Sequence, residues 1–199
     1  MTGDTIAAIS TPLGMGGIGI VRISGPKAVE IVDSIFKGKV RPKKVRRRRM
    51  LYGRIVDDRG EEVDEVLVSV MRAPHTYTTE DVVEINCHGG MAVTRRVLRL
   101  VLERGARMAR PGEFTLRAFL GGRIDLAQAE AVADIVRAGS ERARRAAYAQ
   151  LSGVLSEKVR ELRGRLLDLI SHMEADIDFP EDVELADDEV RGCLMGVLE

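Results

Sequence analysis

The sequence predicts an α+β sheet domain followed by part of an all-α domain. Short apolar segments with strand-like alternation fill the first part of the chain, and 13 of the 20 glycines lie before residue 118. In the second part, apolar residues recur every three to five positions, as they do on one face of a helix. We therefore predict two domains, 1–118 and 119–199.

The charges divide at the same place. Residues 1–118 carry 21 basic and 14 acidic side chains, whereas residues 119–199 carry 10 basic and 17 acidic ones. The formal net charge of zero is therefore the sum of a basic half and an acidic half. A zero of this kind does not exclude a polyanion as a partner.

The first domain is predicted from its strands and two helices. The expected strands are 17–23, 51–56, 66–70 and 82–87. Pro26 fits the first turn of a helix whose apolar stripe runs from Ala28 to Phe36. Gly89 and Gly90 precede a second helix, which Gly105 closes at a position that favours a left-handed cap. Strands and helices in this order are typical of an α+β sheet domain.

The second domain is predicted to be helical. Asp125 can cap a first helix, with Gln128 reaching back as in a capping box. Ser140 can cap a single helix that continues to Ile177, about 37 residues, or roughly 55 Å at ~1.5 Å per residue. An amphipathic helix of that length cannot bury its whole apolar face on a domain ~30 Å across. We therefore expect further helices or a second copy of the chain to cover it. Residues 190–199 are predicted to begin another helix.

Length and composition exclude several classes of protein. The chain has 199 residues, 45% of them hydrophobic and 31% charged, which suits a packed globular domain. It contains no run of the ~20 apolar residues that a membrane-spanning helix needs, and its N-terminus does not resemble a signal peptide. Cys87 and Cys193 are too few for a disulfide framework or a metal cluster. We expect a soluble, cytoplasmic protein with no metal site and no membrane partner.

Glycine motifs do not predict a nucleotide site here. Gly14, Gly16 and Gly19 match the dinucleotide-binding pattern, but they lead into a strand instead of following one. We interpret them as a tight loop whose backbone passes close to another segment. The sequence also contains no Gly-Lys-Ser or Gly-Lys-Thr phosphate loop, so this chain is not by itself a GTPase of that kind, and we predict no catalytic residues in it.

Glu84 is a candidate binding residue because it lies on a predicted strand, where a partly buried carboxylate needs a partner. Arg22, at the end of strand 17–23, is its counterpart. One interpretation is a structural ion pair, or two strand-end charges that reach solvent. The other interpretation is a binding pocket. In it the carboxylate recognises a heterocycle through two hydrogen bonds, and the arginine neutralises an anionic tail.

A basic tract lies between Lys37 and Arg54. It holds ten basic residues and no acidic one, and Tyr52 is its single aromatic residue. This composition predicts a module that contacts the phosphate backbone of a nucleic acid through residues 37–54. The alternative is a solvated loop or edge strand that charge protects from aggregation.

Four segments together resemble one family. They are 4–26 (DTIAAISTPLGMGGIGIVRISGP), 75–90 (HTYTTEDVVEINCHGG), 110–134 (RPGEFTLRAFLGGRIDLAQAEAVAD) and 175–182 (ADIDFPED). In order and spacing they are similar to the N-terminal part of the MnmE, or TrmE, family of tRNA-modification GTPases. The resemblance implies a tetrahydrofolate-binding domain, similar to the folate domain of the glycine-cleavage aminomethyltransferase, followed by the first part of a helical domain.

The resemblance also implies partners. In that family a GTPase domain, which takes GTP, Mg²⁺ and K⁺, is inserted into the helical domain and is not among these residues. The intact proteins form homodimers through the N-terminal domain and act with the flavoprotein MnmG (GidA). Together they form 5-carboxymethylaminomethyl- or aminomethyl-type uridine at the wobble position of tRNA, using a tetrahydrofolate one-carbon unit. Contact of the basic tract with tRNA is the alternative role.

The family's folate contacts fall on Arg22 in VRISG, Glu84 in DVVEI and Arg123 in GGRIDL. The expected ligand is 5-formyltetrahydrofolate or another tetrahydrofolate derivative. Its pterin edge offers an amino group and a ring N–H to Glu84, and its glutamate tail is a dianion that suits Arg22 or Arg123. Three positions depart from the family pattern: Arg123 replaces a usual Lys, Gly121 a usual Asn and Thr79 a usual Gly.

Overall fold

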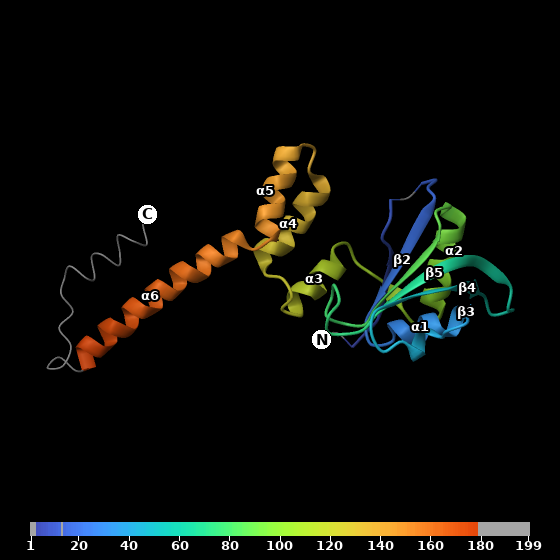
Figure 1. Cartoon of the computed structure of the whole chain (residues 1–199), viewed down its shortest axis with the longest axis horizontal. Coiled ribbons are helices and arrows are strands. Elements are labelled where there is room, and N and C mark those ends of the chain that lie inside the picture. The colour runs from blue at the N-terminus through green and yellow to red at the C-terminus, as the bar shows by residue number, and fades with distance from the viewer. Residues whose placement is uncertain (1–2, 13, 179–199) are drawn as a thin grey trace. The chain divides into compact units, whose positions relative to one another are not determined.

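The computed structural model describes residues 3–12 and 14–178 and divides the chain between Ile124 and Asp125 (Figure 1). The first unit is a mixed sheet with helices, and the second is helical. This arrangement confirms the predicted fold class. The division falls a few residues after the boundary that the sequence predicts at 118.

The first unit contains one seven-stranded sheet in the order β3-β4-β5-β6-β2-β1-β7. All neighbouring strands are antiparallel except β1 and β7, which are parallel. The strands are β1 (Ile6–Ile9), β2 (Ile18–Ser24), β3 (Phe36–Gly38), β4 (Arg49–Val56), β5 (Glu62–Met71), β6 (Val82–His88) and β7 (Arg107–Met108). The four predicted strands are confirmed as β2, β4, β5 and β6. The other three have two to four residues, too few to show a pattern in the sequence.

The predicted helices of the first unit are confirmed as α1 (Ala28–Ile35) and α2 (Met91–Glu103). Gly105 follows α2 with φ +99°, the left-handed conformation expected of it. The structure adds a 3₁₀ turn, η1 (Pro42–Lys44), and a helix, α3 (Glu113–Leu120).

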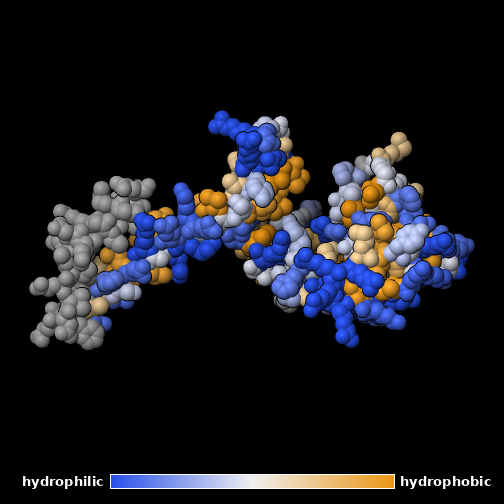
Figure 2. All heavy atoms as spheres, viewed as in Figure 1, coloured by the Kyte–Doolittle hydropathy of each residue, from blue (hydrophilic) through white to orange (hydrophobic). Residues whose placement is uncertain are grey.

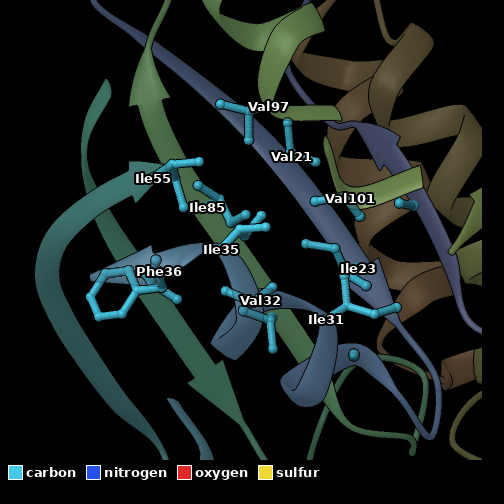
Figure 3. Close-up of a cluster of buried hydrophobic side chains, with 14 of the residues drawn as sticks. Val21, Ile23, Ile31, Val32, Ile35, Phe36, Ile55, Ile85, Val97 and Val101 are labelled. Atoms are coloured by element: carbon cyan, nitrogen blue, oxygen red, sulfur yellow. The ribbon is translucent and has the colours of Figure 1, made fainter. Parts of the chain in front are cut away.

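The core of the first unit lies between α1, α2 and one face of the sheet (Figure 3). Helix residues such as Val32 and Val101 pack toward strand residues such as Val21, Ile55 and Ile85, and all five are fully buried. Because side chains alternate along a strand, burial of this face turns the intervening residues to the other side.

That other side, the outer face, carries Arg22, Glu84, Ser69 and Met50 in one row across β2, β6, β5 and β4. Each residue pairs directly with the next in the register of the sheet, and such pairs point to the same side. The neighbouring row holds Tyr52, which is 65% exposed. The outer face therefore joins the predicted Arg22–Glu84 pair to the strand at the end of the basic tract.

The second unit contains α4 (Leu126–Arg137), α5 (Glu141–Leu151) and α6 (Val154–Asp178). The capping box of Asp125 and Gln128 is present, and Ser140 caps α5 by accepting a hydrogen bond from the backbone N–H of Ala143. The predicted single helix from Ser140 to Ile177 is wrong. Gly153 has φ +90°, a left-handed conformation that ends one helix before the next begins.

The helices of the second unit expose many apolar side chains (Figure 2). On α6 the exposed ones include Val159, Leu162, Leu166, Ile170 and Met173. Among the described residues, no helix is long and apolar enough to cross a membrane. The helix predicted for 190–199 and Cys193 lie outside the described residues.

Candidate functional site

The Arg22–Glu84 ion pair is present and links the middles of β2 and β6. Nε and Nη2 of Arg22 both lie 2.7 Å from Oε1 of Glu84. The side chains are 30% and 21% exposed, respectively, so the pair is half-buried and still reachable from solvent. Oε2 of Glu84 accepts no hydrogen bond from residues 3–12 or 14–178. One carboxylate oxygen is thus held by arginine and the other is available to a ligand.

Tyr77 gathers the three predicted residues. The guanidinium of Arg22 lies 5.6 Å from the centre of the Tyr77 ring, and that of Arg123 lies 4.8 Å from it. Nη1 of Arg123 also donates to the backbone carbonyl of Tyr77 at 3.3 Å. Glu84 joins this group through Arg22. Residues more than 100 positions apart in the sequence therefore meet around one aromatic ring.

The aromatic residues of this site were not predicted from the sequence. Besides Tyr77, Phe114 lies against Arg22, with its ring centre 5.7 Å from the guanidinium. The hydroxyl group of Tyr77 is hydrogen-bonded to Oγ1 of Thr115 at 3.0 Å, which fixes the ring. Only seven aromatic residues, three Tyr and four Phe, occur in the chain, and Tyr77 and Phe114 are two of the four that lie in the segments that carry the resemblance. That scarcity was the signal that could have identified them.

Thr79 and Gly121, two of the departures from the family pattern, are in contact. Thr79 has φ +63°, a conformation that glycine adopts easily and threonine does not. A Cβ atom on Gly121 would lie 2.2 Å from Oγ1 of Thr79. The threonine side chain therefore occupies the space that a side chain at 121 would need. The third departure, Arg123, lies two residues further along.

A second charged group, the Arg117 cluster, lies inside the same unit. Arg117 is 5% exposed and forms ion pairs with Asp4 (2.7 Å), Glu80 (3.0 Å) and Glu113 (3.4 Å). Arg107 binds Asp4 and Glu113 as well. Hydrogen bonds from Arg107, opposed by burial, lower the pKa of Glu113 to about 2. Because each of its carboxylates already has a cationic partner, this cluster serves the fold.

The glycine-rich loop before β2 is confirmed as a place of close approach at Gly16 and Gly19. A Cβ atom on Gly19 would lie 2.6 Å from Oγ1 of Thr94. Gly89 is equally constrained, since its Cβ would lie 2.3 Å from the carbonyl oxygen of Gly16. The expectation also holds at Gly16, whose backbone N–H donates to the carbonyl oxygen of Gly89 at 3.3 Å. At Gly14 a Cβ atom would have no neighbour within 4 Å, so no close approach is present there.

Family models match both units of the chain. Residues 5–123 match the model described as "GTP-binding protein TrmE N-terminus", and residues 126–198 match the one described as "MnmE helical domain". The chain belongs to the MnmE (TrmE) family. The boundary between the two matches coincides with the division between the two units.

Individual MnmE proteins are similar over almost the whole chain. The tRNA modification GTPase MnmE of Alkaliphilus oremlandii is 58% identical over 182 residues, 90% of this chain. That of Geobacillus kaustophilus is 58% identical over 187 residues, and that of Lactobacillus delbrueckii is 54% identical over 197. The chain spans about 40% of the length of these relatives.

Proposed function

We propose that this chain is the folate-binding part of a tRNA-modification GTPase. The observation that carries the proposal is the convergence of Arg22 and Arg123 on Tyr77, with Glu84 joined to them through Arg22. These side chains combine a carboxylate with a free oxygen, an aromatic ring and two cations. A pterin needs an acceptor for its N–H groups and an apolar surface for its ring, and a glutamate tail needs cations.

The two arginines have different roles in this proposal. Nε and Nη2 of Arg22 are both directed at Oε1 of Glu84, so Arg22 orients the carboxylate and neutralises it at the pterin end. Arg123 is exposed and forms no ion pair with any described residue. It is therefore the arginine that is free to bind the carboxylates of the tail.

Calorimetric titration of 5-formyltetrahydrofolate into the full chain tests the site. Glu84→Gln and Arg22→Ala are expected to weaken binding about tenfold or more, since each removes a charge-assisted hydrogen bond. The matched control is Arg72→Ala, because Arg72 and Asp81 form a pair 2.6 Å apart with similar exposure, 29% and 19%. The site assignment is wrong if wild type binds no more tightly than Glu84→Gln and Arg22→Ala.

Family membership supports a proposal for the activity of the whole protein. We propose that the first unit forms a homodimer and that the longer protein acts with the flavoprotein MnmG on the wobble uridine of tRNA, with GTP bound elsewhere in its chain. Exposed apolar residues on the outer face, such as Ile18 and Leu67, support association of this unit with a partner. Light scattering on the full chain should give twice the monomer mass, and a monomer at high concentration would contradict the dimer.

A further inference from the structure

The basic tract keeps most of its charge unneutralised in the folded protein. Two of its ten cations form ion pairs, Arg41 with Asp33 at 2.8 Å and Arg54 with Glu62 at 2.5 Å. Arg48 donates to the backbone carbonyl of His75, which leaves its charge in place. The other seven form no ion pair within the described ranges 3–12 and 14–178: Lys37, Lys39, Lys43, Lys44, Arg46, Arg47 and Arg49.

Six of the eleven arginines of the first unit outside the tract behave differently. They are paired with carboxylates across the sheet and the helices: Arg22, Arg72, Arg96, Arg104, Arg107 and Arg117. A loop charged only for solubility would not need so many like charges together, because like charges in one segment repel and destabilise the folded state. The concentration of unpaired cations in 37–54 points to a polyanionic partner.

The tract also forms a groove. A cavity of about 610 Å³ at the β3 edge of the sheet is lined by Lys37, Lys39, Arg49 and Arg54. Its lining also includes Tyr52, which is 65% exposed, Met50, and Glu62, the carboxylate partner of Arg54. The remaining lining residues are Gly38, Val40, Leu51 and Gly53. Cations beside an accessible aromatic ring are the combination that proteins use to bind nucleic-acid strands, the cations at the phosphates and the ring against a base.

We propose that this surface, the basic edge (residues 37–54), binds RNA through its phosphate backbone. The proposal deepens the proposed function, on which it rests for the choice of RNA, by naming the part of this chain that RNA contacts. An anionic membrane fits less well, because the apolar residues among the loop cations, Pro42 and Val45, are buried and cannot insert into lipid.

The position of the basic edge suits a modifying enzyme. Met50, Ser69, Glu84 and Arg22 form one row on the outer face, three strand steps from end to end. At about 4.8 Å per step, the row measures roughly 14 Å. RNA held at the basic edge would therefore lie within a few nucleotides of the Arg22–Glu84 pair, on the same face of the sheet.

Anisotropy of a fluorescein-labelled RNA stem-loop, titrated with the full chain at several salt concentrations, tests the proposal. Wild type should show an affinity that falls steeply with salt. A variant with Lys43→Gln, Lys44→Gln, Arg46→Gln and Arg47→Gln should bind roughly tenfold or more weakly, with a salt slope reduced by about one for each phosphate that it no longer neutralises. These side chains are exposed and unpaired in the part of the chain that the structure describes, so the variant should keep the wild-type unfolding midpoint.

The matched control removes four exposed, unpaired cations of the first unit outside the tract: Lys27→Gln, Arg59→Gln, Arg95→Gln and Arg99→Gln. It changes the net charge equally and should keep the RNA affinity within about twofold. Tyr52→Ser should weaken binding without changing the salt slope, because stacking releases no counterions. Equal losses of affinity in the two charge variants, or none in the tract variant, would overturn the proposal.

Two further measurements separate the outcomes. Binding to phosphatidylserine vesicles without binding to RNA would assign the basic edge to membranes and overturn the proposal. Affinity of the tract variant for 5-formyltetrahydrofolate should equal that of wild type. If Glu84→Gln leaves folate binding unchanged while the tract variant no longer binds RNA, the folate-site assignment is wrong and the RNA surface stands. If Glu84→Gln weakens folate binding while the tract variant binds RNA like wild type, only the RNA surface is wrong.

Discussion

Arg117 and Arg22 lie in the same unit, yet their surroundings differ. Arg117 is 5% exposed and faces three carboxylates, whereas the Arg22 side chain is 30% exposed and faces one carboxylate and two aromatic rings. A buried guanidinium surrounded by carboxylates has no capacity left for a ligand. A half-exposed one on an aromatic surface keeps that capacity. Burial and the number of partners thus distinguish an arginine that holds the fold from one suited to binding.

The largest expected effect tests the structural side of this comparison. Arg117→Met leaves Glu113 and Glu80 inside the protein with fewer cationic partners, and should lower the free energy of unfolding by about 3–5 kcal/mol. Urea unfolding of the full chain measures it. Arg104→Met removes an exposed pair with Asp58 and should cost less than about 1 kcal/mol. Equal costs for the two variants would contradict the assignment of Arg117 to the fold.

The second largest effect is expected from acid, which should weaken the Arg117 cluster. The pKa of Glu113 is lowered from 4.5 to about 2, so its contribution to stability is present above pH 4.5 and is lost as the pH falls toward 2. Glu113→Gln should remove a pH-dependent stabilisation on the order of 2 kcal/mol over this range. Glu141 has its pKa lowered to about 2 by exposed Arg144 and Arg145, and Glu141→Gln should change the acid profile little. Unfolding midpoints of Glu113→Gln and Glu141→Gln, measured from pH 5 to 2, test this difference. If the two variants lose the same amount of pH-dependent stability, the buried Glu113 contributes no more than the exposed Glu141.

Ligand binding tests the other side of the comparison. Arg123→Ala should weaken 5-formyltetrahydrofolate about tenfold but leave a pterin without a glutamate tail unaffected, whereas Glu84→Gln should weaken both. Neither variant should change the free energy of unfolding by more than about 1 kcal/mol, because both side chains reach solvent. Calorimetry with the two ligands measures the difference. If Arg123→Ala weakens the pterin without a tail as much as it weakens 5-formyltetrahydrofolate, Arg123 binds the pterin end of the ligand and not the glutamate tail.

The smallest effect concerns the loop that connects the two regions. Tyr77 belongs to the candidate site and Glu80 to the Arg117 cluster, and Thr79 lies between them with φ +63°. Thr79→Gly should stabilise the chain by about 1 kcal/mol by removing backbone strain. Gly121→Ala should destabilise wild type through its clash with Thr79 and should cost about 1 kcal/mol less in the Thr79→Gly background. Additive effects in this double-mutant cycle would show that the two residues are not coupled.

Much of the fold, and one pair of the candidate site, could be predicted from local sequence patterns. Alternation identifies β2, β4, β5 and β6, and the spacing of Asp125 and Gln128 identifies a capping box. The pairing of Arg22 with Glu84 could be inferred because each lies on a strand and a half-buried carboxylate needs a cation. These features depend on a few neighbouring residues or on the chemistry of one pair.

The remaining features depend on contacts between distant segments. Gly153 and Gly164 lie in the same striped stretch, yet Gly153 ends a helix and Gly164 lies within α6. The difference arises at the junction with α4, where Gln128 donates to the carbonyl of Leu151 just before the break. Tyr77 likewise meets Arg22 only because β2 pairs with β6 and Arg123 returns to the same place. No local pattern contains that information.

The positions of the tyrosines have a spectroscopic consequence. The chain has three tyrosines and no tryptophan. Tyr77 lies in the candidate site, Tyr52 at the basic edge and Tyr148 on α5 of the second unit. Intrinsic emission therefore originates from one residue in each of three regions. Variants that retain a single tyrosine would provide a separate optical reporter for the candidate site, the basic edge and the helical unit, with no label attached.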